Sequence, residues 1–269
     1  MNTNTLQAVT AQEVEPAGFG KTLRAEWIKL WSVRSTWWTL LTLVVIGVAG
    51  TTLICWGNAD WLASADADES PGSFLTWGMM IAQICAVIIG VLAVTSEYGT
   101  GMIRTTLAAV PARGRVLAAK GIIISSVLMV VGTLTALGGY FGGNYFLDRE
   151  GIGMALEGDV ARAMYGSGLF LAGLALFSLA IGFLVRHTAA AISIVLGLVF
   201  VVGNMALLIP GSFGDWVVKL MPGNAGGSLA TPVSFNPDLL DAWAGFGVFA
   251  AETAALLGLA WFLLRRRDA

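Results

Sequence analysis

The sequence has few charged residues and few of the side chains that build metal or nucleophile sites. Only 12% of its 269 residues are Asp, Glu, Lys or Arg, whereas soluble domains have about 25%. This composition excludes an ordinary soluble globular domain. There are one histidine, His187, and two cysteines, Cys55 and Cys85. Both cysteines lie in apolar stretches, where they act as small hydrophobic side chains, and the three residues make no metal site of standard ligand spacing.

What the sequence has in place of charge is a series of long uncharged runs. Hydrophobic side chains make up 57% of the chain, and a helix needs about 20 mostly apolar residues to cross the hydrocarbon core. Six runs meet this length, which predicts an all-α integral membrane protein. We expect a flexible polar tail at residues 1–18 and one six-helix domain at residues 19–269. The expected spans are residues 37–57, 74–95, 116–141, 163–185, 189–209 and 243–264.

The distribution of basic residues predicts the orientation. If the N-terminus is cytoplasmic, twelve of the fifteen Lys and Arg residues lie on the inner side, and only Arg149, Arg162 and Lys219 lie outside. This asymmetry follows the positive-inside rule, so both termini are predicted to be cytoplasmic. The basic clusters can sit against anionic lipid headgroups, and no nucleic-acid partner is needed to explain them.

The segment before the first span has an amphipathic pattern. Its leucine and aromatic side chains recur at spacings of three and four residues, while its basic residues occupy the other faces. This pattern predicts a helix that lies in the inner membrane interface. The candidate residues of this interfacial helix are Leu23, Arg24, Trp27, Lys29, Leu30 and Arg34.

A second informative segment comes after the second predicted span. Gly99 and Gly101 interrupt the spanning helix, and Pro111 ends the short stretch between that break and the third span. These residues predict a short helix parallel to the inner face. Such a helix is suited to docking a partner. The simpler alternative is a loop that only returns the chain to the membrane and carries positive-inside arginines.

The third predicted span ends in a glycine-rich run. Residues 138–143 read GGYFGG and contain two overlapping pairs of small residues spaced four apart. Such pairs allow another helix backbone to approach closely. We expect this run to pack against a helix or to support self-association.

The connection before the last span, residues 210–241, is long and unusually apolar for an exposed loop. Residues 216–221 are predicted to form a short re-entrant helix that dips into the outer leaflet and is stopped at Pro222. Its candidate gate residues are Trp216, Leu220 and Met221.

Two short motifs resemble catalytic sites but do not satisfy their requirements. Gly20-Lys21-Thr22 resembles the end of a phosphate-binding loop, yet position 15 is Glu where that loop needs glycine. Ser167 and His187 could suggest a serine hydrolase, but they lie at opposite ends of one predicted helix, about 30 Å apart at 1.5 Å per residue. The chain is therefore predicted to be no enzyme and to carry no cofactor.

Glu252 lies near the middle of the last predicted span. A charged residue at that depth costs about 2.5 kcal/mol or more on insertion scales, so it should face other helices or a water-filled cavity. Glu252 has two possible roles. It contacts a substrate or binds a proton, or it is a protonated or hydrogen-bonded group in the packing between helices. Gln83 and Asn204 are possible partners within the pathway, or hydrogen-bonding groups between helices.

Several segments together resemble the membrane subunit of type-2 ATP-binding-cassette (ABC) transporters. The stretch from Leu23 to Trp38 is similar to the N-terminal segment of these permeases, and the stretch from Met221 to Gly226 is similar to their outer loop before the last helix. With the six-helix topology, the resemblance covers nearly the whole chain. The segment after the second span matches the order of that family's residues at Glu97, Gly101, Arg104, Leu107, Pro111, Arg113 and Lys120.

The resemblance implies the permease subunit of an ABC-2 type exporter in a bacterial plasma membrane. Such a permease pairs with a second permease, identical or related, and with two ATPase subunits that hold ATP and Mg. The expected cargo is a hydrophobic or amphipathic compound such as an antibiotic, a peptide or a lipid-like molecule. In this family the segment after the second span is the coupling helix. The residues expected to contact the ATPase are Glu97, Tyr98, Gly101, Arg104, Thr105, Leu107, Pro111 and Arg113.

Three other functions stay open at this point. An ion-coupled secondary transporter would use Glu252, follow the proton gradient and need no ATPase. An intramembrane enzyme is disfavoured because the sequence lacks a nucleophile, base and metal constellation. A membrane scaffold that transports nothing is the third alternative.

Overall fold

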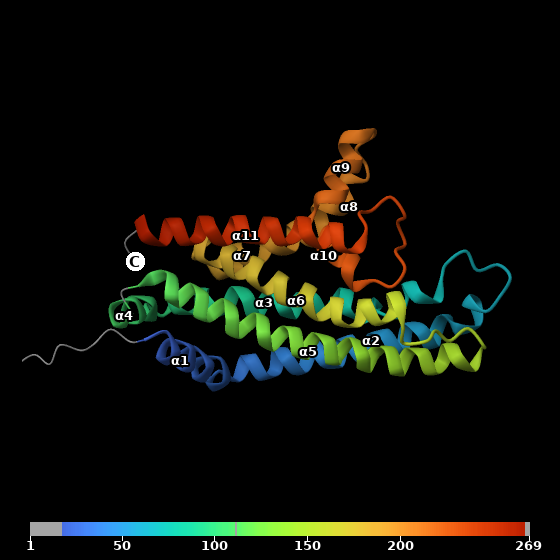
Figure 1. The fold of residues 1–269 in the computed structure, drawn as a ribbon, viewed down its shortest axis with the longest axis horizontal. Coiled ribbons are helices and arrows are strands. Elements are labelled where there is room, and N and C mark those ends of the chain that lie inside the picture. The colour runs from blue at the N-terminus through green and yellow to red at the C-terminus, as the bar shows by residue number, and fades with distance from the viewer. Residues whose placement is uncertain (1–17, 111, 267–269) are drawn as a thin grey trace, which may run out of the picture.

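The computed structural model describes residues 18–110 and 112–266, and this part of the chain is helical without strands (Figure 1). The tail predicted at residues 1–18 lies outside the described residues except for Gly18, and so does Pro111. Six helical segments are long and apolar enough to cross a membrane, which confirms the predicted number. They are α2 (Arg34–Leu62), α3 (Trp77–Gly99) with the preceding turn η1 (Pro71–Ser73), α5 (Arg113–Arg149), α6 (Gly158–Val185), α7 (Thr188–Leu196) continued by η2 (Gly197–Val202) and α8 (Gly203–Ala206), and α11 (Ala242–Arg266).

Most of these helices are longer than the predicted spans. The largest difference is α5, which has 37 residues and is therefore about 55 Å long at 1.5 Å per residue. The hydrocarbon core is only about 30 Å thick. An uncharged run marks only the apolar part of a helix, whereas the helical backbone of α5 extends beyond that run, out to Arg113 and Arg149.

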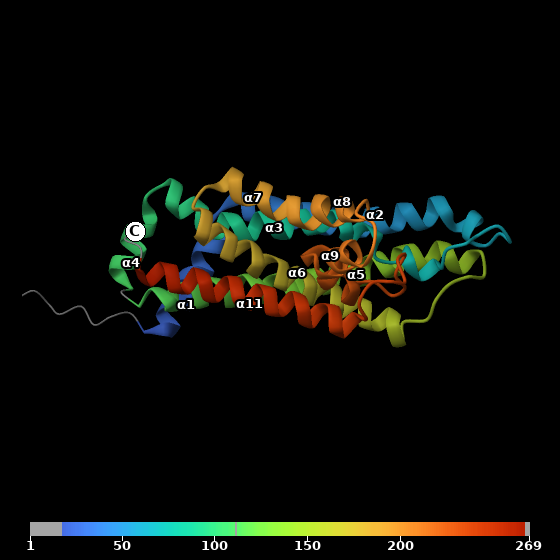
Figure 2. The ribbon, with the colours of Figure 1, turned by 90° about the horizontal axis from the view of Figure 1, so that it is seen from above.

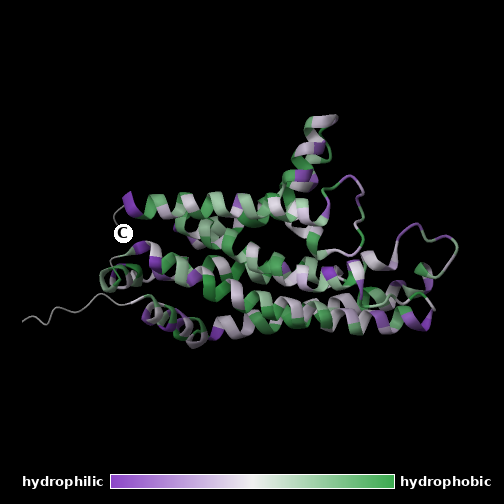
Figure 3. Cartoon of the chain, viewed as in Figure 1, coloured by the Kyte–Doolittle hydropathy of each residue, from purple (hydrophilic) through white to green (hydrophobic). Residues whose placement is uncertain are grey.

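The long helices lie side by side along the longest axis of the molecule (Figures 1 and 2). Hydrophobic residues dominate their length and hydrophilic residues gather toward both ends (Figure 3). α5 packs against α2 and α6, and α3 packs against the same two helices. Of the six apolar stretches, that of α6 is the most enclosed, with 72% of its residues buried, whereas that of α11 has 22%. α11 therefore presents most of its apolar surface outward.

Glycines set the distance between several of these helices. The run predicted to pack closely contacts α2, since a methyl group at Gly139 would lie 3.1 Å from the Thr51 side chain and one at Gly143 would lie 2.8 Å from Cys55 Sγ. Gly78 of α3 lies so close to Gly47 of α2 that a methyl group on it would collide with the Gly47 carbonyl oxygen. The expected close packing is thus present within the chain, where it joins α2 to α5.

The connection before α11 contains two helices where one was predicted. α9 (Ser212–Leu220) begins four residues earlier than expected and projects away from the bundle (Figure 1). Pro222 does not stop helical structure, because it is the first residue of α10 (Pro222–Gly227), which leads into the turn η3 (Ser228–Ala230). Proline suits this position, since the first turn of a helix leaves its N–H groups without intrahelical acceptors.

Candidate functional site

Two short helices lie at the end of the bundle where α11 terminates (Figures 1 and 2): α1 (Phe19–Ser32) and α4 (Met102–Ala109). α4 is the short helix predicted after the second span. Gly101 precedes it with a φ of 73°, a left-handed conformation that glycine adopts without steric cost. The chain can therefore turn sharply between α3 and α4.

α1 turns a polar face toward the bundle. Its buried residues are Thr22 and Glu26, whereas Trp27 and Ile28 are 48% and 57% exposed. The amphipathic pattern predicted a helix here, but it did not indicate that a glutamate would be the buried contact. An acid three residues before Lys29 within such a helix is the signal that sequence reasoning missed.

Four charged side chains meet where α1 touches the bundle, and we call them the inner charge cluster: Glu26, Lys29, Glu97 and Lys120. Lys120 Nζ donates hydrogen bonds to Glu26 Oε2 at 2.7 Å and to Glu97 Oε1 at 2.6 Å. Lys29 Nζ donates to Glu26 Oε1 at 2.8 Å and to Glu97 Oε1 at 3.0 Å. Two carboxylates and two ammonium groups balance each other, and they join α1, α3 and α5.

Three of the four members of the inner charge cluster are buried, and the Lys29 side chain is 33% exposed. Glu26, Glu97 and Lys120 are 6%, 2% and 3% exposed. Burial by itself lowers the pKa of Lys29, but its hydrogen bonds to Glu26 and Glu97 outweigh burial and raise the pKa above the ordinary 10.5. Lys29 therefore stays charged at neutral pH, and its contribution is lost only as the pH rises through this raised pKa.

Lys29 also connects the cluster to α4, because its Nζ lies 3.3 Å from Thr106 Oγ1. Through this contact, the same four charges join the N-terminal helix α1, the ends of two spanning helices and the short helix α4. Lys29 is therefore the side chain of the cluster that links α4 to α1, α3 and α5.

The residues predicted to contact a partner differ in their exposure. Glu97 is buried in the inner charge cluster, and Arg113 Nη1 donates to the Leu264 carbonyl oxygen at 2.7 Å, at the C-terminal end of α11. These two side chains hold the protein together instead of presenting themselves to a partner. Gly101, which precedes α4, and Arg104 and Thr105 on α4 are exposed. Tyr98 and Leu107 are half-buried, and Pro111 lies outside the described residues.

The residues predicted for the interfacial helix have different roles. Lys29 belongs to the inner charge cluster, and Arg34 lies in α2 because α1 ends at Ser32. Arg24 is exposed, while Leu23 and Leu30 are half-buried. The exposed Trp27 packs edge-to-face on Trp31 at 5.4 Å between ring centroids. This aromatic pair gives α1 an outward surface of the kind found at membrane interfaces.

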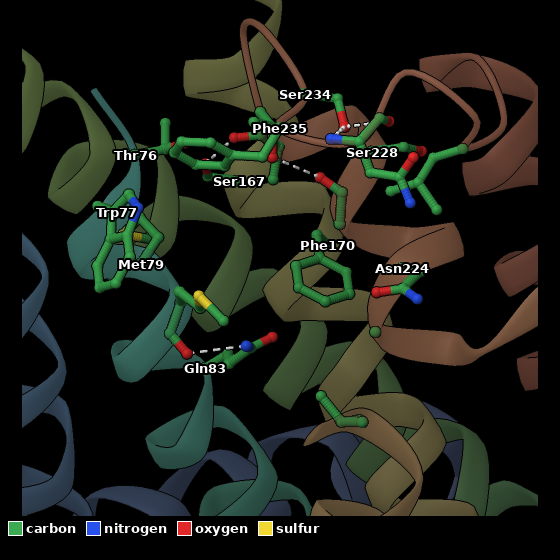
Figure 4. A pocket seen from close by; sticks show the side chains of 18 of the residues that line it. Thr76, Trp77, Met79, Gln83, Ser167, Phe170, Asn224, Ser228, Ser234 and Phe235 are labelled. Atoms are coloured by element: carbon green, nitrogen blue, oxygen red, sulfur yellow. Dashed lines mark hydrogen bonds between the residues drawn. The ribbon is translucent and has the colours of Figure 1, made fainter. Parts of the chain in front are cut away.

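A cavity of about 250 Å³ lies toward the other end of the bundle, between α3, α6, η2, α10 and the loop after η3. Gln83 of α3 and Asn204 of α8 both line it, although they come from different predicted spans. Figure 4 shows Gln83, Phe170 and Asn224 on the elements around it. None of its described lining residues is charged.

Glu252 and the predicted gate residues do not line this cavity. Glu252 Oε2 is buried without a hydrogen-bond partner among the described residues, so the structure does not bring it to Gln83 or Asn204. Trp216 is 57% exposed on α9, and Leu220 is also exposed, whereas Met221 lies half-buried beside Gly203. α10 lines the cavity with Gly223 and Asn224.

The described residues hold no group of three or more His, Cys, Asp or Glu side chains that could bind a metal ion. The inner charge cluster provides ion pairing, and the cavity provides uncharged hydrogen-bonding groups.

No protein-family model matches this chain, and no curated protein matches it significantly.

Proposed function

We propose that this chain is the permease subunit of an ATP-driven exporter of the ABC-2 type in a bacterial plasma membrane. The observation that carries the proposal is the inner charge cluster, which ties the exposed helix α4 to α1, α3 and α5. A short helix that is open to the cytoplasm and mechanically joined to spanning helices is what a separate ATPase needs in order to drive them. The sequence resemblance to type-2 ABC permeases favours the same function.

In this proposal α4 is the coupling helix. Its exposed residues Arg104 and Thr105, together with the preceding Gly101, dock one of two ATPase subunits, which hold ATP and Mg between them. Closure of the ATPases displaces α4, and the inner charge cluster passes that displacement to the spanning helices because its ion pairs do not separate easily. Both termini and α1 then lie on the cytoplasmic side, with α1 in the interface and α9–α10 as the outer segment.

A second permease, identical or related, completes the proposed transporter. The apolar stretches of α2, α7–α8 and α11 are only 28%, 28% and 22% buried within the chain. These surfaces are available to lipid and to a second copy. The cargo class is hydrophobic or amphipathic, as expected for a pathway that opens between two such bundles.

The test is recovery of an ATPase subunit with the tagged chain from its native membranes in mild detergent. Arg104→Glu reverses the charge of the exposed face of α4, and we expect it to abolish ATPase recovery and the associated ATPase activity. Arg149→Glu is the matched control, because Arg149 is exposed at the opposite end of α5. Equal recovery of an ATPase with both variants would refute α4 as the docking helix.

One observation favours a second candidate, an ion-coupled carrier. Glu252 Oε2 is a buried carboxylate oxygen without a partner among the described residues, which is a feature of proton-binding sites in transporters. Recovery of the chain alone, together with proton-driven flux that Glu252→Gln abolishes, would support the carrier and exclude the ABC permease.

A further inference from the structure

The cavity at the far end of the bundle from α4 has two buried oxygen atoms without partners. Gln83 is 6% exposed and Ser73 is 2% exposed. Neither Gln83 Oε1 nor Ser73 Oγ has a hydrogen-bond partner among the described residues. The amide nitrogen of Gln83 is already used, since Nε2 donates to the Met80 carbonyl oxygen at 2.8 Å (Figure 4). Gln83 lines the cavity with its acceptor unused, and a buried unpaired acceptor costs free energy until a donor reaches it.

The rest of the wall is uncharged and includes aromatic side chains. Phe170 of α6 and Phe200 of η2 line the cavity, and no Asp, Glu, Lys, Arg or His is among its described lining residues. η2 is a π-helical stretch, and such stretches are rare and frequent at functional sites. An ion entering this cavity would lose its hydration without meeting an opposite charge, which is strongly unfavourable.

One side of the cavity reaches the surface of the chain. Met80 of α3 and Asn204 of α8 line it and are both exposed, so the cavity opens between these two helices. The outer wall is held in place by Arg162, whose Nη1 donates to the Leu229 carbonyl oxygen at 3.0 Å and whose Nη2 donates to the Thr231 carbonyl oxygen at 3.2 Å.

From these features we infer that the cavity is a binding site for one end of an uncharged amphipathic molecule. A hydroxyl or amide N–H of the ligand donates to Gln83 Oε1, a second polar group pairs with Ser73 Oγ, and an aromatic or aliphatic body packs on Phe170 and Phe200. The volume of about 250 Å³ equals about eight water molecules at ~30 Å³ each, so a larger ligand extends through the open side. A role as the cargo site rests on the proposed function, whereas binding itself does not.

The test uses the full-length chain in lipid nanodiscs without any ATPase. The probe is a benzyl alcohol that carries a photoreactive diazirine, and the matched probe is the benzoic acid of the same skeleton, which is negatively charged at neutral pH. Labelled residues are mapped by mass spectrometry as a function of probe concentration. We expect the alcohol to label α3 and η2 saturably and the acid to label them far less.

Two variants test the hydrogen bonds. Gln83→Leu keeps the size of the side chain and removes the acceptor, so half-maximal labelling should need about five times more alcohol, the effect of one ordinary hydrogen bond. Ser73→Ala removes a single oxygen atom, and it replaces Gln83→Leu as the test variant if Gln83→Leu folds poorly. Asn58→Leu is the control, because this amide lies in α2 and bonds to the Ile54 carbonyl oxygen away from the cavity.

Each result decides the inference. Saturable labelling by the alcohol that Gln83→Leu or Ser73→Ala weakens and Asn58→Leu does not would support it. Equal labelling by both probes, unchanged labelling in both variants, or unsaturable labelling spread over the lipid-facing helices would overturn it. Failure to recover an ATPase from native membranes would instead count against the proposed function and leave a saturable binding site in place.

Discussion

At the scale of single residues, the charges of the inner charge cluster fix how the N-terminal helix is attached. Thr22 and Glu26 are the buried residues of α1, and Glu26 Oε2 lies 2.7 Å from Lys120 Nζ. A buried ion pair adds little net stability compared with apolar residues of the same size, because desolvation offsets the attraction. Removal of one charge is different, since the remaining partners stay buried without compensation.

Lys120→Met is therefore expected to lower the free energy of unfolding by about 3–5 kcal/mol. The measurement is thermal unfolding of the purified chain in detergent. The double variant Lys120→Met/Glu97→Gln removes one charge of each sign, so we expect it to be more stable than Lys120→Met alone. Strict additivity of the two single effects would show that these charges are not coupled.

At the scale of elements, close helix crossings depend on glycine. Gly78 of α3 faces the backbone of α2 at Gly47. Gly90 of the same helix faces α6, where a methyl group would lie 2.8 Å from the Ser178 side chain. α3 is thus held between α2 and α6 at distances that larger side chains do not allow, which agrees with its high burial.

Gly78→Ala should destabilise the chain by about 1–3 kcal/mol, because the added methyl group meets backbone that cannot rotate away. Gly57→Ala is the matched control in α2, where a methyl group meets nothing within 4 Å. Alanine favours helix more than glycine does, so the control should be neutral or slightly stabilising. Both are checked by the temperature at which the purified protein unfolds, and equal effects would rule out the crossing as the cause.

The segment around η3 is hydrogen-bonded to one arginine of α6. Arg162 donates to four carbonyl oxygens, those of Ser228, Leu229, Thr231 and Pro232. Lysine cannot reproduce this planar fork of donors. Arg162→Lys should therefore speed amide hydrogen exchange around η3 by about tenfold or more, the equivalent of one or two lost hydrogen bonds. Unchanged exchange there would show that the segment is held by packing alone.

At the scale of the whole molecule, the two ends differ in charge and in architecture. α1, α4 and the end of α11 lie together at one end, and the longest parts of α2 and α5 extend to the other (Figure 1). Basic residues concentrate at the first end, including Arg104, Arg113 and Arg265. By the positive-inside rule we expect that end to face the cytoplasm.

Cysteine labelling in intact cells checks this orientation. Thr105→Cys should react with a membrane-impermeant maleimide only after the membrane is opened, whereas Asp66→Cys should react from outside, since both positions are exposed. The native Cys55 and Cys85 are 0% and 6% exposed, so background labelling of these two cysteines by the maleimide should be low. The reverse pattern would invert the topology and remove α4 from the ATPase side.

The sequence alone was enough to predict the number of helices that could span a membrane and the short helix after Gly101. Both depend on local properties, namely the length of apolar runs and the backbone preferences of glycine and proline. It also indicated Gln83 and Asn204 as polar residues worth attention. It did not indicate Glu26 or the role of Lys120, because a buried charge looks like a surface charge until its partner is known.

The tertiary structure alone decided which residues meet. Glu26, Glu97 and Lys120 are separated by 23 to 94 positions along the chain, and only the packing of α1, α3 and α5 makes them one cluster. The same packing buries Glu97, commits Arg113 to the end of α11 and leaves Arg104 exposed. Local patterns determine the elements because hydrogen bonding and burial act over a few residues, whereas a charge cluster or a cavity exists only where distant elements come together.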